Sequence, residues 1–167
     1  SYLCSTNTAK AAPSPAPTIT RPPTVTAAPT VAPLIADDST IRTAVSLWFS
    51  DRAAAIRTYG HISTWQTGEV TDMSELFEDA SSFNEDISAW DTSSVTAMWD
   101  MFEDASSFNQ NIGGWNVGAV INMEEMFEDA TAFDQDLGWC VDDDVDLGLA
   151  FGETPCESTS CGVTQGD

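Results

Sequence analysis

The stretch FEDASSFNEDISAWDTSSVTAMWDM, residues 77–101, decides how this chain folds, because its pattern returns every 25 residues. Residues 102–111 read FEDASSFNQN, and residues 127–136 read FEDATAFDQD. A fixed period of this length is the sequence signature of a repeat architecture. Six apolar columns keep the interval: Trp65, Trp90 and Trp115; Ile62, Ile87, Ile112 and Leu137; Val70, Val95, Val120 and Val145; Met73, Met98 and Met123; Phe77, Phe102 and Phe127; Phe83, Phe108 and Phe133.

Each repeat is predicted to contain a strand, a turn, a second short strand and a short helix. Ile87 and Trp90 flank an extended piece, and residues 91–94, Asp-Thr-Ser-Ser, have the composition of a turn. The apolar residues of WDMFEDA, residues 99–105, follow helical spacing, which predicts about two turns of helix. A unit this small buries its apolar face only when it is stacked on its neighbours.

The predicted fold class is therefore an α/β repeat solenoid, a right-handed, leucine-rich-repeat-like coil over residues 62–139. The Met and aromatic columns are expected to fill its core rather than to line a ligand site. Residues 37–61 are predicted to form a helical N-terminal cap. Its first helix, residues 40–49, has Asp38 or Ser39 as its cap and an apolar face of Ile41, Ala44, Val45, Trp48 and Phe49. Its second helix, residues 52–59, is expected to start at Asp51 and to end at Gly60.

At the other end the repeat slips by one residue, because Trp139 comes 24 residues after Trp115. Three cysteines follow, so residues 140–167 are predicted to form a disulfide-stapled C-terminal cap. The four disulfide candidates of the chain are Cys4, Cys140, Cys156 and Cys161, and the three in the cap leave one over. An even number of cysteines beside a mucin-like Pro/Thr stretch favours an extracellular location.

The repeat also resembles a known family. Its pattern, F-x-x-A-x-x-F-N-x-x-I-x-x-W-x-x-x-x-V-x-x-M-x-x-M-F, is similar to that of BspA-type leucine-rich-repeat surface proteins, the family of domain of unknown function 285. The lead-in TAVSLW…YGHISTW and the ending GWCV…TPCESTSCGV resemble the algal and protist members, and the resemblance covers about residues 38–163. It implies an extracellular or surface-displayed repeat domain, and it implies no catalytic residues.

The charge is strongly lopsided. All five Lys and Arg residues lie within the first 57 positions, whereas residues 58–167 contain 24 acidic residues and no Lys or Arg. Such an acidic body argues against nucleic acid as a partner. No run approaches the roughly 20 apolar residues of a membrane helix, so no membrane insertion is expected.

Stacking would align carboxylates as well as apolar residues. Glu78-Asp79, Glu103-Asp104 and Glu128-Asp129 would form two acidic columns, which could bind Ca²⁺ but are expected to be solvated surface. Asn84, Asn109 and Asp134 share one turn position, which predicts a ladder that satisfies backbone groups. His61, the single His, is expected to be structural, and no catalytic site and no resident cofactor or metal are predicted.

Residues 1–36 are predicted to be an extended Pro/Thr-rich arm. Ile19, Val25 and Val31 recur every six residues, so in an extended chain they share one face and are the expected assembly contact. All prolines of the arm except Pro22 have odd numbers, so the N–H groups lost to proline fall almost entirely on one edge. The chain has no N-x-Ser/Thr sequon, so the glycosylation expected here is O-linked, with candidates Ser14, Thr18, Thr20, Thr24, Thr26 and Thr30.

Two functions are consistent with this pattern. The first is a non-enzymatic extracellular structural protein, a subunit of a head-to-tail filament or surface assembly in which the arm packs on a neighbouring copy, with Lys10 and Arg21 meeting an acidic body. The second is a monomeric surface adhesin or receptor-like binding module on an O-glycosylated stalk. Cys4 could bond the leftover cap cysteine within or between chains, or the arm could fold back on its own body.

Overall fold

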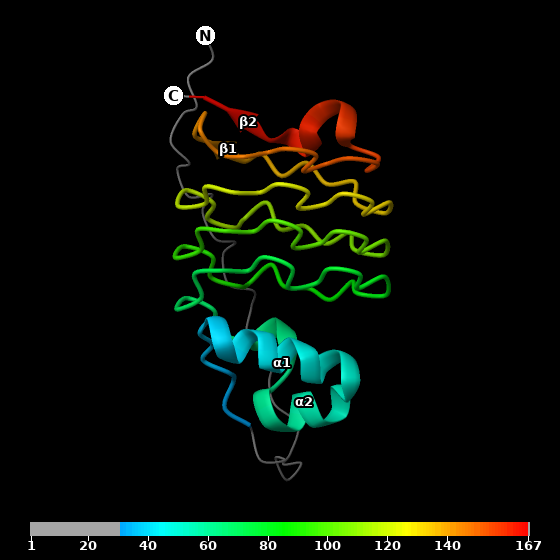
Figure 1. Ribbon diagram of the computed structural model, residues 1–167. Helices are drawn as coiled ribbons and strands as arrows, with labels where there is room; N and C mark the ends of the chain where they lie inside the picture. The colour runs from blue at the N-terminus through cyan, green and yellow to red at the C-terminus, as the bar shows by residue number, and fades with distance from the viewer. Residues whose placement is uncertain (1–30, 167) are drawn as a thin grey trace, which may run out of the picture.

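The computed structural model describes residues 31–166. In chain order its elements are α1 (Asp38–Ser50), α2 (Arg52–Tyr59), the 3₁₀ helix η1 (Ile62–Thr64), β1 (Cys140–Val141), the 3₁₀ helix η2 (Glu157–Gly162) and β2 (Thr164–Gln165). Between η1 and β1 the chain winds into successive coils that lie one above the other. Figure 1 shows α1 and α2 together at one end of this stack and β1, β2 and η2 at the other.

The two helices form because the sequence supplies a cap, an apolar stripe and a stop. The carboxylate of Asp37 accepts hydrogen bonds from the N–H groups of Ser39 and Thr40 at 3.1 and 2.8 Å, so α1 begins two residues earlier than predicted. The expectation that Asp38 or Ser39 caps this helix is therefore wrong. Asp51 caps α2, and Gly60 ends it with a φ of 76°, as predicted.

One face of α1 covers the first coil. Its Ile41, Ala44, Val45 and Trp48 are buried, as their spacing predicts. Phe49, expected on the same face, is 47% exposed but still packs edge-to-face on Phe77 and Phe83. The helix thus closes the stack with apolar side chains.

The short helix predicted for residues 99–105 is absent, and that prediction is wrong. The segment consists of turns, with Asp100 and Asp104 at φ angles of 52° and 55°. Equivalent positions in the other coils are also left-handed: Glu75, Asp79, Glu125, Asp129, Leu149 and Glu153. Apolar spacing alone does not separate this backbone from a helix, because both place the same residues inward.

Hydrogen bonds between coils explain why the turns win over a helix. The N–H groups of Asp100, Phe102 and Asp104 donate to carbonyls of the next coil at 2.9–3.0 Å. The N–H groups of Met101 and Glu103, which alternate with them, donate within the turn to the residue three positions earlier. Coil-to-coil bonding therefore uses every second N–H group, which a helix would have kept for itself.

The predicted strands of the repeats are also not formed as strands. Elsewhere in the coils the described chain has only isolated parallel bridges, which join Asp72, Ala97, Asn122 and Asp146 in series. A further bridge joins Ile35 to Gln66, so the segment that enters the body already runs alongside the first coil.

Aromatic columns fill the middle of the stack, as the 25-residue interval predicts. The rings of Phe77, Phe102 and Phe127 lie 5.4 and 5.3 Å apart in stacked orientation. A second column, Phe83, Phe108 and Phe133, is buried beside the first. Trp90 and Trp115 are tied between coils by indole N–H donation to the carbonyls of Ile62 and Ile87 at 2.9 and 3.2 Å.

The last coil departs from this order. Trp139 is fully buried, yet its indole N–H has no acceptor among the described residues. β1 and β2 pair in parallel, and a disulfide joins Cys156 to Cys161, as expected of a stapled cap.

Candidate functional site

Carboxylates line one side of the stack in three columns rather than two. The predicted columns, Glu78 with its equivalents and Asp79 with its equivalents, are accompanied by Glu75, Asp100 and Glu125. This third column was missed, although its acidic residues also recur every 25 positions. The backbone positions these side chains, because each of these coils has two left-handed acidic residues four positions apart, as at Asp100 and Asp104.

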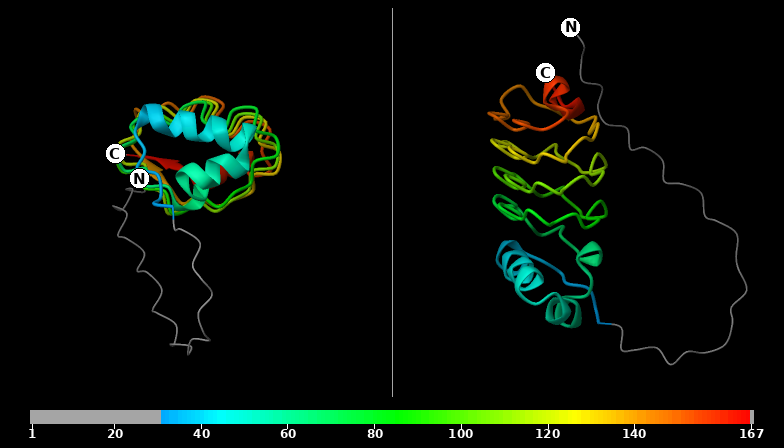
Figure 2. Two further views of the ribbon diagram at one scale, coloured as in Figure 1. Left: turned by 90° about the horizontal axis from the view of Figure 1, so that it is seen from below. Right: turned by 90° about the vertical axis from the view of Figure 1, so that its right-hand side faces the viewer.

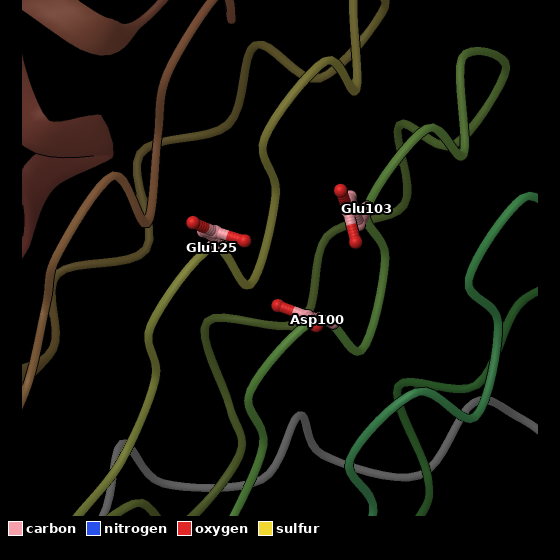
Figure 3. Close-up of side chains that lie close together, drawn as sticks. All are labelled: Asp100, Glu103 and Glu125. Atoms are coloured by element: carbon pink, nitrogen blue, oxygen red, sulfur yellow. The ribbon is translucent and has the colours of Figure 1, made fainter.

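The columns converge most closely in the middle of the stack. Figure 3 shows Asp100 and Glu103 from one coil facing Glu125 from the next. A carboxylate oxygen from each of the three lies within 4.8 Å of the other two. All three side chains are partly buried, so water screens their repulsion incompletely.

Repulsion and burial shift proton binding in this cluster. Partial burial, followed by the neighbouring carboxylates Asp100 and Glu78, raises the pKa of Glu103 to about 7. Burial and then Glu125 raise the pKa of Asp100. Burial and then neighbouring acids likewise raise the pKa of Glu78 and of Glu128. The face therefore loses protons over a broad range of pH that reaches neutrality.

Three convergent carboxylates are ligands of the type that hard divalent cations take. If Ca²⁺ or a similar ion bound here, Asp100, Glu103 and Glu125 would hold it and water would complete its coordination. The Asp79 column lies beside this cluster in sequence but is not part of it. Of the residues in the two predicted acidic columns, only Glu103 belongs to this cluster, and Asp100 and Glu125 come from the third column.

The predicted ladder of turn amides is confirmed. The side-chain oxygen of Asn84 accepts the N–H of Asn109 at 2.9 Å, and that of Asn109 accepts the N–H of Asp134 at 3.1 Å. Gln110 and Gln135 add side-chain bonds to the same two asparagines. These residues link coils, so their polar atoms are committed to structure.

His61 lies where the helical cap meets the first coil. Its Nδ1 is 2.9 Å from the hydroxyl of Ser63 and also accepts the N–H of Ser63 at 3.3 Å. Its Nε2 is 3.8 Å from Glu85, whose other oxygen pairs with Arg52 at 2.7 Å. A serine neighbour was not anticipated for this histidine. Because Nδ1 caps η1 and Glu85 is held by Arg52, the group fastens the cap to the repeats.

A shallow groove of about 490 Å³ opens where the chain enters the body. Ile35, Trp65 and Gln66 are among the residues that line it, and the side chain of Ile35 is 70% exposed. Of the predicted assembly contacts, Val31 is 42% exposed, while Ile19 and Val25 lie outside the described residues. The six glycosylation candidates and Cys4 lie outside them as well.

Cysteine pairing in the C-terminal cap follows the predicted pattern in part. Cys156 and Cys161 bond each other, and Cys140 is also disulfide-bonded. Within residues 31–166 no helix is long and apolar enough to cross a membrane.

Comparison with known proteins gives one finding. The model of the family described as Mycoplasma protein of unknown function, DUF285, matches residues 43–158. No curated protein and no solved structure matches the chain.

Proposed function

The chain belongs to the DUF285 family, and from this premise we propose that it is a non-enzymatic structural subunit of an extracellular filament or surface assembly. The stacked coils would be a right-handed, leucine-rich-repeat-like solenoid of the BspA type. The arm of one subunit would pack on the body of the next, head to tail.

The observation that carries this proposal is the way residues 31–36 join the body. The N–H of Ala36 donates to the carbonyl of Gln66, and the N–H of Gln66 donates to the carbonyl of Leu34, both at 2.8 Å. This parallel bridge sets the chain in an extended conformation where it enters the body, and Val31 and Ile35 carry exposed apolar side chains there. A strand-like arm with an unburied apolar face suits addition to a neighbouring surface.

The two ends of the body support propagation rather than closure. Helices cover one end of the stack, and a disulfide-stapled cap covers part of the other. A contact between unlike surfaces repeats from copy to copy and builds a filament. O-glycans on the Thr-rich face of the arm would then point away from the contact.

The experiment is sedimentation velocity of the full chain over a range of concentrations. The intact chain is expected to form a series of species that grow with concentration. Replacing Ile19 and Val25 with Asp should reduce assembly, whereas Ile121→Asp, at a 66% exposed site on the body, should not. A chain that stays monomeric at every concentration would contradict the filament and favour the stalked adhesin or receptor-like module.

The pairing of the four cysteines gives a second test of the assembly. Since Cys156 and Cys161 bond each other, Cys4 and Cys140 are the remaining pair of this four-cysteine chain. We propose that Cys4 and Cys140 bond each other. Non-reducing electrophoresis distinguishes a bond between copies from a bond within one chain. A ladder of covalent multimers indicates bonds between copies, and a single monomer band indicates a bond within one chain.

A further inference from the structure

Hydrogen bonds between the acidic turns run in one direction only. In each inner coil four alternate N–H groups donate to carbonyls of the following coil, as Met98, Asp100, Phe102 and Asp104 do. The carbonyls of these same residues are used inside the turn; that of Met98, for example, accepts from Met101. Within this row, each acidic turn therefore presents donors toward the C-terminal end of the stack and acceptors toward the N-terminal end.

The last coil ends this series with donors that have no acceptor within residues 31–166. The equivalent N–H groups belong to Leu147, Leu149, Phe151 and Glu153, and none of them has an acceptor within residues 31–166. The carbonyls of these residues do bond inside the turn. Those of Leu147, Leu149 and Phe151 accept from the N–H groups of Ala150, Gly152 and Thr154. The segment thus keeps the conformation of an inner coil but has no coil above it.

The apolar side chains around this row are less buried than their equivalents in the inner coils. Leu149 is 61% exposed and occupies the position of Glu75, Asp100 and Glu125 in the other coils. Leu147 continues the Met73, Met98 and Met123 column but is only partly buried, whereas the methionines are fully buried. Figure 2 (right) shows the red C-terminal segment lying over only part of the last coil.

At the opposite end of the stack, one of the four equivalent carbonyls is occupied and a helix covers the coil. The carbonyl of Ser74, in the first coil, would be such an acceptor, but it already receives the guanidinium of Arg42 at 2.9 Å. Helix α1 lies over the same coil, so a second body cannot stack directly onto these donors. The occupant must be a free segment of chain.

The chemistry of the row defines that segment. It must offer carbonyls at alternate residues, it needs no N–H groups on the same edge, and it should be apolar because Leu149 borders the site. An anion would be repelled by the nearby carboxylates of Asp146 and Glu153. A proline-rich extended segment meets all three requirements, because proline keeps its carbonyl and lacks the N–H.

We infer that three consecutive N–H groups of the row formed by Leu147, Leu149, Phe151 and Glu153 bind the carbonyls of Pro13, Pro15 and Pro17 of a second copy of this chain. In an extended chain Pro13, Pro15 and Pro17 share one edge, which then carries acceptors and no donors. This inference rests on the proposed head-to-tail function, and it names the surface that receives the arm. Residues 31–36 leave the body at the end opposite this row, so a following subunit brings its arm to the row directly.

Amide hydrogen exchange on the full chain, at a concentration where it assembles, tests the inference. At least three consecutive amides among residues 147, 149, 151 and 153 should exchange roughly tenfold or more slowly in the intact chain than in a variant lacking residues 13–17. Deleting residues 5–9 removes the same length of arm without touching Ile19, Val25 or Val31, and is the matched control. It should leave protection of the row unchanged.

A substitution on the receiving side gives an independent readout. Leu149→Asp places at this position the residue type found in the inner coils and suits a left-handed backbone, so the fold should persist. It should lower protection of the row and raise the assembly concentration roughly tenfold, as expected when a partly exposed leucine contact is lost. Ile56→Asp, an exposed site in α2 at the other end of the stack, should change neither.

The outcomes separate the two proposals. Equal exchange of the row with and without residues 13–17 overturns this site even if filaments form. Protection that persists in a dilute monomer and disappears on deletion overturns the second copy as occupant, and the filament with it. Protection that appears only on assembly and requires residues 13–17 supports both.

Discussion

The two ends of the stack differ in how the outer face of the end coil is covered and hydrogen-bonded. At the N-terminal end, α1 covers the first coil with four buried side chains, and Asp38 and Arg42 reach down to bond its backbone. At the C-terminal end, η2 and β2 complete only part of the last coil, and the turn at residues 147–153 keeps donors that have no acceptor among the described residues. The hydrogen-bond ladder of the acidic turns has a direction, so its N-terminal end needs added donors and its C-terminal end needs added acceptors. At the N-terminal end, Arg42 donates to the carbonyl of Ser74. At the C-terminal end, the described residues supply no acceptor.

The largest expected effect is at the closed end. Trp48 is 4% exposed and packs edge-to-face on Trp65 and His61. Trp48→Ala should lower the free energy of unfolding by about 3–5 kcal/mol, because it opens a cavity between α1 and the first coil. Urea denaturation measures this. Leu149→Ala, at the open end, is the comparison and should change stability by less than about 0.5 kcal/mol; similar losses in the two variants would show that the ends do not differ.

The next effect concerns the disulfide of the C-terminal cap. Replacing Cys156 and Cys161 by Ser should cost about 2 kcal/mol, since the bond closes a loop of only five residues' separation. The loss should be local. Hydrogen exchange should quicken in residues 155–166 and stay unchanged in α1; uniform quickening through the whole stack would contradict an end-specific staple.

A smaller effect is expected at Asp38. Its carboxylate accepts the N–H and hydroxyl of Thr71 at 2.6 and 2.7 Å. Burial alone would raise the pKa of Asp38, but these bonds, that from the N–H of Asp72 and the charge of Arg42 lower it. The stabilisation is therefore present above the ordinary pKa of 3.8 and is lost as pH falls below it. Asp38→Asn should cost roughly 1 kcal/mol at pH 7 and much less at pH 3, by thermal unfolding; an equal cost at both would refute the ionic contribution.

The smallest expected effect is at the acidic face between the two ends. The pKa of Glu103 is raised to about 7, so the folded chain holds a proton that the unfolded chain releases near pH 4.5. Stability should therefore fall as pH rises from about 4.5 to 7, by on the order of 1 kcal/mol after solvent screening. Glu103→Gln should flatten this part of the pH profile, and Glu69→Gln, outside the cluster, is the control. A variant profile identical to that of the intact chain would contradict the assignment.

The features that were predicted correctly are those set by the identity and spacing of side chains. The interval of 25 residues placed Phe77, Phe102 and Phe127 in one column, and Asp51 and Gly60 marked the ends of α2. It failed at residues 99–105, because a helix and a chain of alternating turns bury the same apolar positions. Only the bonds to the next coil decide between them, and no local pattern reports those bonds.

The acidic cluster and the open donor row show a similar limit. Glu125 could have been placed beside Asp100 by counting in 25s, but its approach to Glu103 depends on how the coils stack. The free N–H groups of residues 147–153 depend on where the repeats stop relative to the cap. Asp at positions such as 100 and 104 did offer one local signal, since the short Asp and Asn side chains tolerate left-handed backbone better than most others do.

The most direct test of the central claim is a mixing experiment between two defective chains. One chain carries Leu149→Asp and keeps an intact arm, and the other lacks residues 13–17 and keeps an intact receiving row. Sedimentation velocity should show each chain alone as predominantly monomer at a concentration where the natural chain assembles, and the mixture as a 1:1 dimer. A mixture that stays monomeric, or a defective chain that assembles unaided, would contradict a contact between the arm of one subunit and the open end of another.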